Sequence, residues 1–506
     1  MQNSERDEGH RWVVLGIIMM GTFMAILDAS IVNVALPHMM SAFGVNRNQI
    51  EWVTTGFMLA TAVAMPVVGW IVLRSGHKSL YIVSLGLFTL GSAACAFSWS
   101  YQVLLVSRIV QAVGGGAIQP VGMTIIAELF EPHERGKALG IWGTGIMIGP
   151  TLGPTLGGYL TDWFSWRTIF SVNLPIGVVT LIAALLVMDR DDPSRRKNVN
   201  FDWFGFLFLS AALISGLLAL SQGQEKGWSS NYVMTCLIIA TVGTVLFLGI
   251  ESSIQDPLLD LSLFTHRNYS LSMVLALFRA VGLFGGIFLL PIFLENLVGY
   301  TTIRTGLLMM PGAVTIGIMM PISGKMADRY SARWLVTIGT IVTGFSFFLY
   351  ANLDPLSGMT VIIGPQIIRG VGMALMMAPL MRTAINSVPR HQVATASSFL
   401  NVAQRLGGSF GIAILNTFVT DSVRKHAIRI AEHAAPQSSH FVATVHQIAT
   451  FPHYLNNNLS AAAQGQLLYV KTILHKANVL GFDNGFFLGG IIVLSSIPLC
   501  LMLKSR

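Results

Sequence analysis

Long apolar runs recur along the whole chain, separated by short polar segments that contain Lys, Arg, Pro and Gly. Most runs have about 20 residues, the length that an α-helix needs to cross the hydrocarbon core of a bilayer. They are longer than barrel strands and lack the alternation typical of such strands. We therefore predict an all-α polytopic membrane protein with fourteen spans, at 12–36, 50–73, 80–98, 101–128, 138–160, 169–188, 203–220, 232–250, 270–297, 305–324, 334–351, 361–385, 393–419 and 482–503.

The composition excludes several classes of protein. Of the 506 residues, 53% are hydrophobic and 11% are charged, whereas a soluble globular chain carries about 25% charged residues. This rules out a soluble multidomain enzyme, a disordered chain and a nucleic-acid-binding module. Cys95, Cys236 and Cys500 lie in apolar runs, so we predict neither a disulfide framework nor a metal site.

The distribution of Lys and Arg predicts the orientation. The polar segment 1–11 precedes a run that is too long for the apolar core of a cleaved signal, so we expect this run to remain as the first helix. An even number of spans places both termini on one side. The loops of that side hold 17 Lys and Arg, against 4 in the short loops of the other side. Because basic loops favour the cytoplasm, we predict that 1–11 and 504–506 are cytoplasmic, which explains the net charge of +8 without nucleic acid.

One polar stretch, 420–481, is much longer than the other connections and lies outside in this orientation. We expect much of it to be helical. Long loops usually have a role, but a variable decoration without function is an equal alternative.

Two parts of the chain resemble each other. Both the second and the tenth span end with a Gly that is followed five residues later by Arg. The fourth and the twelfth span each contain an Arg and a Gln three residues apart with a Gly three residues after the pair: Arg108, Gln111 and Gly114, and Gln366, Arg369 and Gly372. The chain thus divides into a first six-helix half (12–188), linkers with an inserted helix pair (189–268) and a second half (269–503). Related halves are typical of secondary transporters, in which the substrate binds between the halves.

A charged residue within a span is a functional hypothesis by default. Asp28 lies about 12 Å from the outer end of its span and Arg108 about 10 Å from the same side, at 1.5 Å per residue. We predict a direct or water-bridged pair. Burial favours the neutral acid and a nearby cation favours the carboxylate, so the pair could load and release a proton. The alternative is a fixed ion pair that holds helices together.

Other polar residues near mid-depth are candidates for a substrate cavity: Asn33, Arg279, Asn401, Gln404 and Arg405. Arg279 and Arg405 could meet an anionic substrate or a carboxylate. Each could equally bond to backbone carbonyl groups across a helix contact.

The fifth span carries glycine at every fourth position, which leaves one helix face without side chains. Small residues at this spacing allow another helix to approach closely, and proline within the helix bends it. The pattern indicates either ordinary close packing or a bendable seal between the halves. The residues are Gly145, Gly149, Pro150, Gly153, Pro154 and Gly157.

The two Gly-Arg loops on the cytoplasmic side are candidates for an inner gate. Their basic side chains could pair with carboxylates or helix ends of neighbouring helices. The residues are Gly69, Arg74, Gly76 and Lys78 in the first copy, and Gly324, Asp328 and Arg329 in the second. Leu73 stands where the second copy has its acid, so a symmetric lock is not expected.

Together these segments resemble a family over nearly the whole chain. The chain is similar to the major facilitator superfamily, specifically its fourteen-helix drug:proton antiporter branch of EmrB-like multidrug exporters. The segments that resemble its motifs are 27–37, 69–78, 108–114, 143–158 and 166–177. The resemblance implies proton-driven export of hydrophobic drugs, with Asp28 as the protonation site and Arg108 and Gln111 in the proton-transfer motif.

The long outer stretch is similar to that of EmrB-type proteins, which implies a periplasmic adaptor protein and an outer-membrane channel as partners. Two departures are Leu73, in place of the usual acid, and the order Gln404–Arg405, which is shifted from the common Arg–Gln.

The leading hypothesis is therefore a proton-coupled antiporter in the bacterial inner membrane, surrounded by membrane lipids, with protons as coupling ion and no cofactor. An exporter of a specific metabolite, siderophore or lipid is the alternative. A membrane scaffold is less consistent with an isolated intramembrane acid. We expect no enzyme, because the spans lack paired carboxylates or a His cluster, and no ATP-driven pump, because 114–116 lacks the Lys of a phosphate-binding loop.

Overall fold

The computed structural model describes residues 2–195, 198–354, 358–433 and 461–504. Within these ranges the chain forms helices and no strand, which confirms the all-α prediction. The helices are α1 (Gln2–Phe43), α2 (Arg47–Ile50), α3 (Trp52–Ser75), α4 (His77–Ala96), α5 (Tyr101–Leu129), α6 (Arg135–Trp163), α7 (Thr168–Ser171), α8 (Asn173–Val187), α9 (Trp203–Lys226), α10 (Asn231–Glu251), α11 (Arg267–Asn296), α12 (Thr302–Arg329), α13 (Ala332–Tyr350), α14 (Met359–Asn386), α15 (Val393–His433), α17 (Ala461–Leu494) and α18 (Ile497–Leu501), with 3₁₀ turns η1 (Pro193–Arg195), η2 (Leu261–Thr265) and η3 (Arg390–Gln392).

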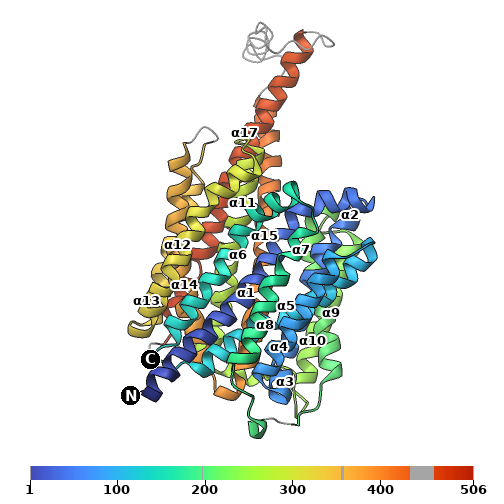
Figure 1. Cartoon of the computed structure of the whole chain (residues 1–506). Coiled ribbons are helices and arrows are strands. Elements are labelled where there is room, and N and C mark those ends of the chain that lie inside the picture. Colours follow the sequence, from blue (N-terminus) through green and yellow to red (C-terminus); the bar gives the residue numbers. More distant parts are fainter. Residues whose placement is uncertain (1, 196–197, 355–357, 434–460, 505–506) are drawn as a thin grey trace.

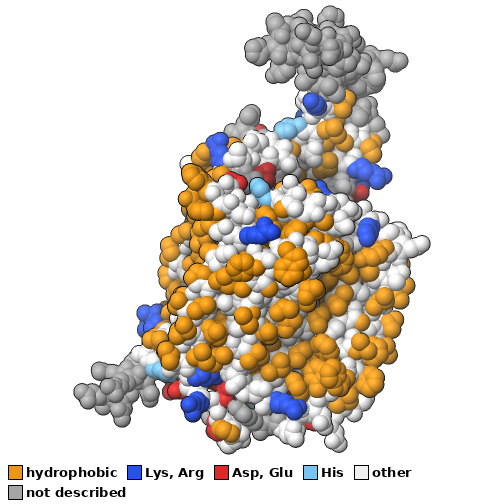
Figure 2. Space-filling view, turned by 45° about the vertical axis from the view of Figure 1, so that its right-hand side comes forward, with side chains coloured by type: hydrophobic (Ala, Val, Ile, Leu, Met, Phe, Trp, Pro, Cys, Tyr) orange, Lys and Arg blue, Asp and Glu red, His pale blue; other side chains and the backbone are white. Residues whose placement is uncertain are grey.

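In the part of the chain that the structure describes, twelve helical segments are long and apolar enough to cross a membrane. On the face shown in Figure 2, hydrophobic side chains cover the broad middle of the molecule, and charged side chains gather towards its two ends. The two remaining predicted spans, 138–160 and 393–419, correspond to α6 and α15, which lie within the bundle (Figure 1). Neither helix is as apolar as those twelve segments, because α6 contains many glycine, threonine and proline residues and α15 contains several polar ones. The count of fourteen therefore stays a prediction.

Both termini lie at one end of the bundle, which we call the terminus end (Figure 1). At the opposite end, α15 and α17 extend side by side well beyond the other helices (Figure 1). Residues 420–433 continue α15 and residues 461–481 begin α17, as expected for a largely helical outer stretch. Residues 434–460, the middle of that stretch, lie outside the described residues.

The inserted pair, α9 and α10, packs along the edge where the two halves meet. The two helices contact each other, and α9 also contacts α3 of the first half and α15 of the second. In the connection between α9 and α10, the Trp228 indole N–H donates to the hydroxyl of Thr417 on α15 at 3.0 Å. The pair therefore bridges the halves instead of standing apart from them.

The glycine stripe of α6 packs against α1, within the same half. A Cβ atom at Gly149 would lie 2.9 Å from Ile26 Cγ2 and 3.1 Å from the Leu27 backbone nitrogen, and one at Gly157 would lie 2.9 Å from Ile31. Gly145 and Gly153 likewise face α1, and α6 remains one helix through Pro150 and Pro154. The proposed seal between the halves is therefore wrong for this stripe, and close packing is correct.

The contact between the halves uses the opposite face of α6. A Cβ at Gly140 would lie 3.1 Å from Pro321 Cα of α12. Gly140 precedes Gly149 by nine residues, which places them about 180° apart around a helix with 3.6 residues per turn. The sequence showed that one face is smooth, but another glycine-bearing face of the same helix meets the second half.

This packing predicts different effects for two glycine-to-alanine changes in α6. Gly149→Ala should destabilise the protein by about 1–3 kcal/mol, the usual range for overpacking, because the new methyl group meets the fixed backbone of α1. Thermal unfolding in detergent, followed by tryptophan fluorescence, measures the effect. Gly158→Ala is the control, because its Cβ would lie 4.0 Å from the nearest atom, Val34 Cγ1. Equal melting temperatures for the two variants would contradict the close contact.

Candidate functional site

Asp28 and Arg108 form a direct ion pair in the interior of the first half. Arg108 Nη1 lies 2.5 Å from Asp28 Oδ2, and the two side chains are 1% and 0% exposed. Gln111, one turn along α5 from Arg108, joins them: its Oε1 accepts from Arg108 Nη1 at 2.7 Å, and its Nε2 donates to Asp28 Oδ1 at 2.9 Å. The predicted pair is therefore present without a bridging water, and Gln111 closes a three-residue ring.

Aromatic side chains and backbone enclose the guanidinium group. Arg108 Cζ lies 4.0 Å from the ring centre of Phe57 and 5.5 Å from that of Phe170. Its Nε donates to the Val53 carbonyl at 3.4 Å. Cation–π attraction is strongest when the cation is desolvated. The surroundings therefore fix the position of the cation, and Asp28 supplies its countercharge.

Asn173, at the start of α8, is a member of this site that we did not single out from the sequence. Its Nδ2 donates to Asp28 Oδ1 at 2.8 Å and to the Ser92 hydroxyl at 3.0 Å. Its Oδ1 is buried and has no hydrogen-bond partner. Its place in segment 166–177, which resembles a family motif, was the available signal. Asp28 thus receives donors from two residues besides Arg108, and α1, α5 and α8 all contribute.

The corresponding residues of the second half lack an acid. Arg369 of α14 donates to Gln366 Oε1 at 3.1 Å and to the Leu283 carbonyl at 3.3 Å, and it is buried. No carboxylate lies within ion-pair distance of it among the described residues. The repeated Arg–Gln spacing therefore keeps a similar local contact in both halves, but the acid is present only in the first.

The residues predicted for a substrate cavity differ in exposure and in their contacts. Arg279 is 2% exposed, and its Nε has no partner in the described structure. Asn401 Nδ2 donates to the Ser397 carbonyl of its own helix at 2.8 Å. Asn33 is exposed, and Gln404 and Arg405 are half-buried on α15. Contact of Arg279 or Arg405 with an anionic substrate stays a prediction.

Polar contacts join the halves at the terminus end. Asp328 of α12 accepts hydrogen bonds from the Gly136 and Lys137 backbone N–H groups at the start of α6, both at 2.9 Å. Arg382 Nε lies 2.8 Å from the same carboxylate. A carboxylate at a helix N-terminus is stabilised by the unpaired N–H groups and the helix dipole. Asp328 therefore links the second half to the first, with Gly324 lying close to Gly136.

A second contact of this kind lies nearby. Arg135 Nη1 donates to Asn386 Oδ1 at 2.7 Å, and Asn386 Nδ2 donates to the Pro132 carbonyl at 3.2 Å. Gly69 of α3 also packs closely against Thr395 of α15. The two halves thus contact each other at the terminus end of the bundle.

The first Gly-Arg loop makes hydrogen bonds to a linker residue, Asp191. Asp191 accepts from the backbone N–H groups of Lys78 and Ser79, each at 2.9 Å, and from the Ser79 hydroxyl at 2.7 Å. Partial burial acts to raise the pKa of Asp191, but these hydrogen bonds outweigh it, so its pKa lies below the usual value. Gly76 makes the turn with a φ of 93°.

Of the basic residues in these loops, Lys78 makes one of the two predicted kinds of contact, with the end of a neighbouring helix. Its Nζ donates to the Leu185 and Met188 carbonyls at the C-terminal end of α8, at 3.1 and 2.5 Å, so this contact lies within the first half. Arg74 and Arg329 are exposed, and neither lies within ion-pair distance of a carboxylate in the described ranges. The acid, Asp328, makes the contact between the halves, because its short side chain reaches backbone N–H groups that have no helical partner.

The site predicts strong coupling between Asp28 and Arg108. Removing one partner of a buried ion pair costs about 3–5 kcal/mol, whereas replacing both by apolar residues is often neutral. Asp28→Leu and Arg108→Leu should each lower the melting temperature, and the double variant should recover most of the loss. The exposed pair Arg47–Glu51, at 3.0 Å, serves as control and should show little coupling. Additive losses at Asp28 and Arg108 would contradict a buried ion pair.

Comparison with known proteins agrees with this architecture. The chain is 32% identical over 505 residues to the uncharacterized MFS-type transporter YhcA of Bacillus subtilis (strain 168), which covers 99% of this chain and 94% of the relative. It is 31% identical over 439 residues to the multidrug export protein EmrB of Escherichia coli (strain K12), covering 86% of each. The solved structure of the proton:xylose symporter XylE has the same fold, with a TM-score of 0.61 and 13% identity over 99% of this chain and 97% of that one. The sequence model of the Major Facilitator Superfamily matches residues 18–412. The chain is therefore a multi-pass membrane protein that belongs to the Major Facilitator Superfamily of transporters.

Proposed function

We propose that this protein is a proton-coupled antiporter that exports hydrophobic drugs or other toxic compounds across the bacterial inner membrane. The observation that carries the proposal is the buried contact of Asp28 with Arg108, Gln111 and Asn173. Similarity to proteins named for multidrug export supports the substrate class. An isolated acid with a single cation beside it, deep in a membrane helix bundle, is suited to bind and release a proton.

The chemistry of the site suggests how a proton would act. When Asp28 is charged, its carboxylate accepts hydrogen bonds from Arg108 and from the side-chain amides of Gln111 and Asn173. Protonation of Asp28 removes its charge, so the attraction to Arg108 weakens and the buried guanidinium loses its countercharge. A change in protonation thus changes the energy of the contact between α1 and α5. We propose that this change is linked to the opening of one side of the transporter and the closing of the other.

Alternating access would require the contacts at the terminus end to break. They consist of two backbone hydrogen bonds and one Arg contact at Asp328, and of the Arg135–Asn386 hydrogen bond. All of these groups lie near a helix end, where water can replace the lost partners. We propose that this arrangement closes the cytoplasmic side, with both termini in the cytoplasm as the basic loops predict.

The outer extension of α15 and α17 supports a further part of the proposal. In the proposed orientation it lies in the periplasm, beyond the rest of the bundle. We propose that it contacts a periplasmic adaptor protein, which connects the transporter to an outer-membrane channel in a tripartite pump.

Asp28→Asn tests the proton coupling. The amide cannot carry the charge, so proton-coupled drug uptake into everted vesicles should fall to the level of vesicles without the protein. The amount of inserted protein should stay the same. Asp162→Asn is the control, because Asp162 is exposed at the far end of α6, and its uptake should be normal. Accumulation against a gradient by Asp28→Asn would exclude Asp28 as the coupling residue.

A shortened segment between residues 420 and 481 tests the adaptor contact. Transport in vesicles should be retained, because the membrane part of the bundle is unchanged. Drug resistance of whole cells should fall in a host without other pumps, because the adaptor would no longer dock. Susceptibility should be measured with and without a proton uncoupler. Unchanged resistance of whole cells would count against the tripartite assembly.

A further inference from the structure

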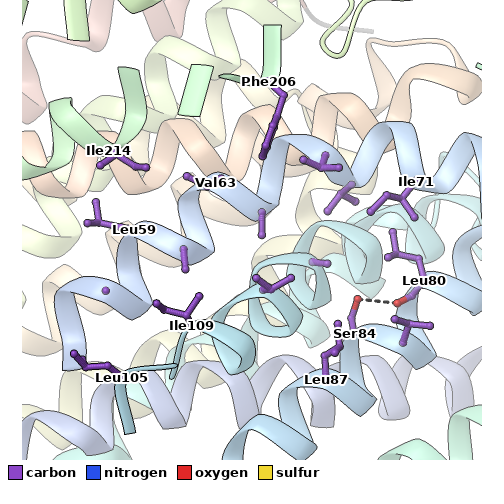
Figure 3. A pocket seen from close by; sticks show the side chains of 18 of the residues that line it. Leu59, Val63, Ile71, Leu80, Ser84, Leu87, Leu105, Ile109, Phe206 and Ile214 are labelled. Atoms are coloured by element: carbon purple, nitrogen blue, oxygen red, sulfur yellow. Dashed lines mark hydrogen bonds between the residues drawn. The ribbon is translucent and has the colours of Figure 1, made fainter. Parts of the chain in front are cut away.

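An apolar groove lies on the outer side of the first half, next to the inserted pair. It has a volume of about 590 Å³ and is formed by α3, α4 and α5, with Phe206 and Ile214 of α9 on the remaining side (Figure 3). Val83, Ile109 and Val113 line it and are exposed. In a membrane-embedded bundle, an exposed apolar rim faces lipid. The groove is therefore open to the bilayer.

Among the residues that line the groove, only Ser84 and Trp52 have side chains that can form a hydrogen bond. The Ser84 hydroxyl donates to the Leu80 carbonyl of its own helix at 2.7 Å (Figure 3). The indole of Trp52 lies at one end of the groove and is exposed, as aromatic residues at a membrane–water interface commonly are. A hydrocarbon chain suits this lining.

The groove has the length of a bilayer. On α3 its lining begins at Trp52 and ends at Ile71, a separation of 19 residues, or about 28 Å at the rise of an α-helix. The hydrocarbon core of a membrane is about 30 Å thick. The acyl chains of one phospholipid extend over about half of the hydrocarbon core, so a lipid of the leaflet at the terminus end would fill the half of the groove towards Ile71.

A cation stands at the terminus end of the groove. Arg74 lies three residues beyond Ile71 and so continues the same face of α3, because residues three apart are neighbours on a helix. Its guanidinium carbon is 5.5 Å from the ring centre of Trp70, and its side chain is exposed. No carboxylate of the described chain lies within ion-pair distance of it, whereas the neighbouring Lys78 is bound to two carbonyls.

We propose that this groove is a binding site for an anionic phospholipid from the membrane leaflet at the terminus end. An acyl chain lies in the groove, between α3 and the inserted helix α9, and the headgroup phosphate contacts Arg74. The lipid fills the space between the first half and the inserted pair, and so completes the packing of α9 from the membrane side.

Lipid retention tests the site with the full-length protein. The protein is reconstituted in nanodiscs that contain equal amounts of phosphatidylglycerol and phosphatidylcholine with matched chains, and is then extracted in mild detergent. Native mass spectrometry counts the lipids that remain bound. We expect one phosphatidylglycerol molecule to be retained with a preference of about fivefold, the ratio that one cation near a lipid surface supplies.

Two variants separate the chain from the headgroup. Val83→Trp should abolish retention, because Val83 lines the groove six residues from the start of α4, close to the end at which Arg74 stands. Its side chain is 55% exposed, so the larger indole has room to fill the groove. Arg74→Gln should keep a bound lipid but lose the preference for phosphatidylglycerol.

Matched controls keep the result specific. Val245→Trp introduces the same side chain at an exposed position on α10, outside the groove, and Arg329→Gln removes the equivalent cation of the second half. Both should retain phosphatidylglycerol as the unchanged protein does. Retention by Val83→Trp, an unchanged preference in Arg74→Gln, or displacement of the lipid by a hydrophobic drug at its transport concentration would overturn the proposal.

Discussion

A charge buried among membrane helices must have a partner, and this constraint shapes the first half of the protein. Asp28 and Arg108 are both nearly inaccessible to solvent, so each depends on the other for a countercharge. The remaining polar atoms of the carboxylate are met by Gln111 and Asn173, which brings α1, α5 and α8 together. The cost of leaving any one of these groups unpaired is high in a medium without water. The relative placement of three helices therefore follows from one acid.

Helix α6 packs closely on both sides, but only one of its contacts also has polar groups at its end. Within the first half, α6 meets α1 through a glycine stripe at van der Waals distance, with backbone against backbone. Between the halves, Gly140 of α6 packs equally closely against α12, and at the terminus end a carboxylate, an amide and helix-end N–H groups add hydrogen bonds. Close packing is lost entirely when helices separate, whereas water can replace the hydrogen bonds at the helix ends.

Fixed helix geometry explains which features could be predicted from the sequence. The depths of Asp28 and Arg108 follow from the helix rise and the ends of the apolar runs, so their pairing could be predicted. The role of Asn173 could not, because it lies 145 residues from Asp28 along the chain, and no periodic pattern marks it. The glycine stripe revealed a smooth helix face but not its partner, which proved to be α1. Depth alone also grouped Asn33 with Asn401, and it could not predict that one is exposed and the other bonds to its own helix.

The comparison of the two halves explains why repeated sequence does not mean repeated chemistry. Arg369 and Gln366 are three residues apart, as Arg108 and Gln111 are, and each Arg contacts its Gln. In the first half the arginine faces an acid, whereas in the second it reaches a backbone carbonyl. A carbonyl cannot gain or lose a proton, so this contact of the second arginine does not depend on the protonation of an acid. If protonation of Asp28 drives a movement, it acts through the contact between α1 and α5 in the first half, because the corresponding arginine of the second half has no carboxylate partner among the described residues.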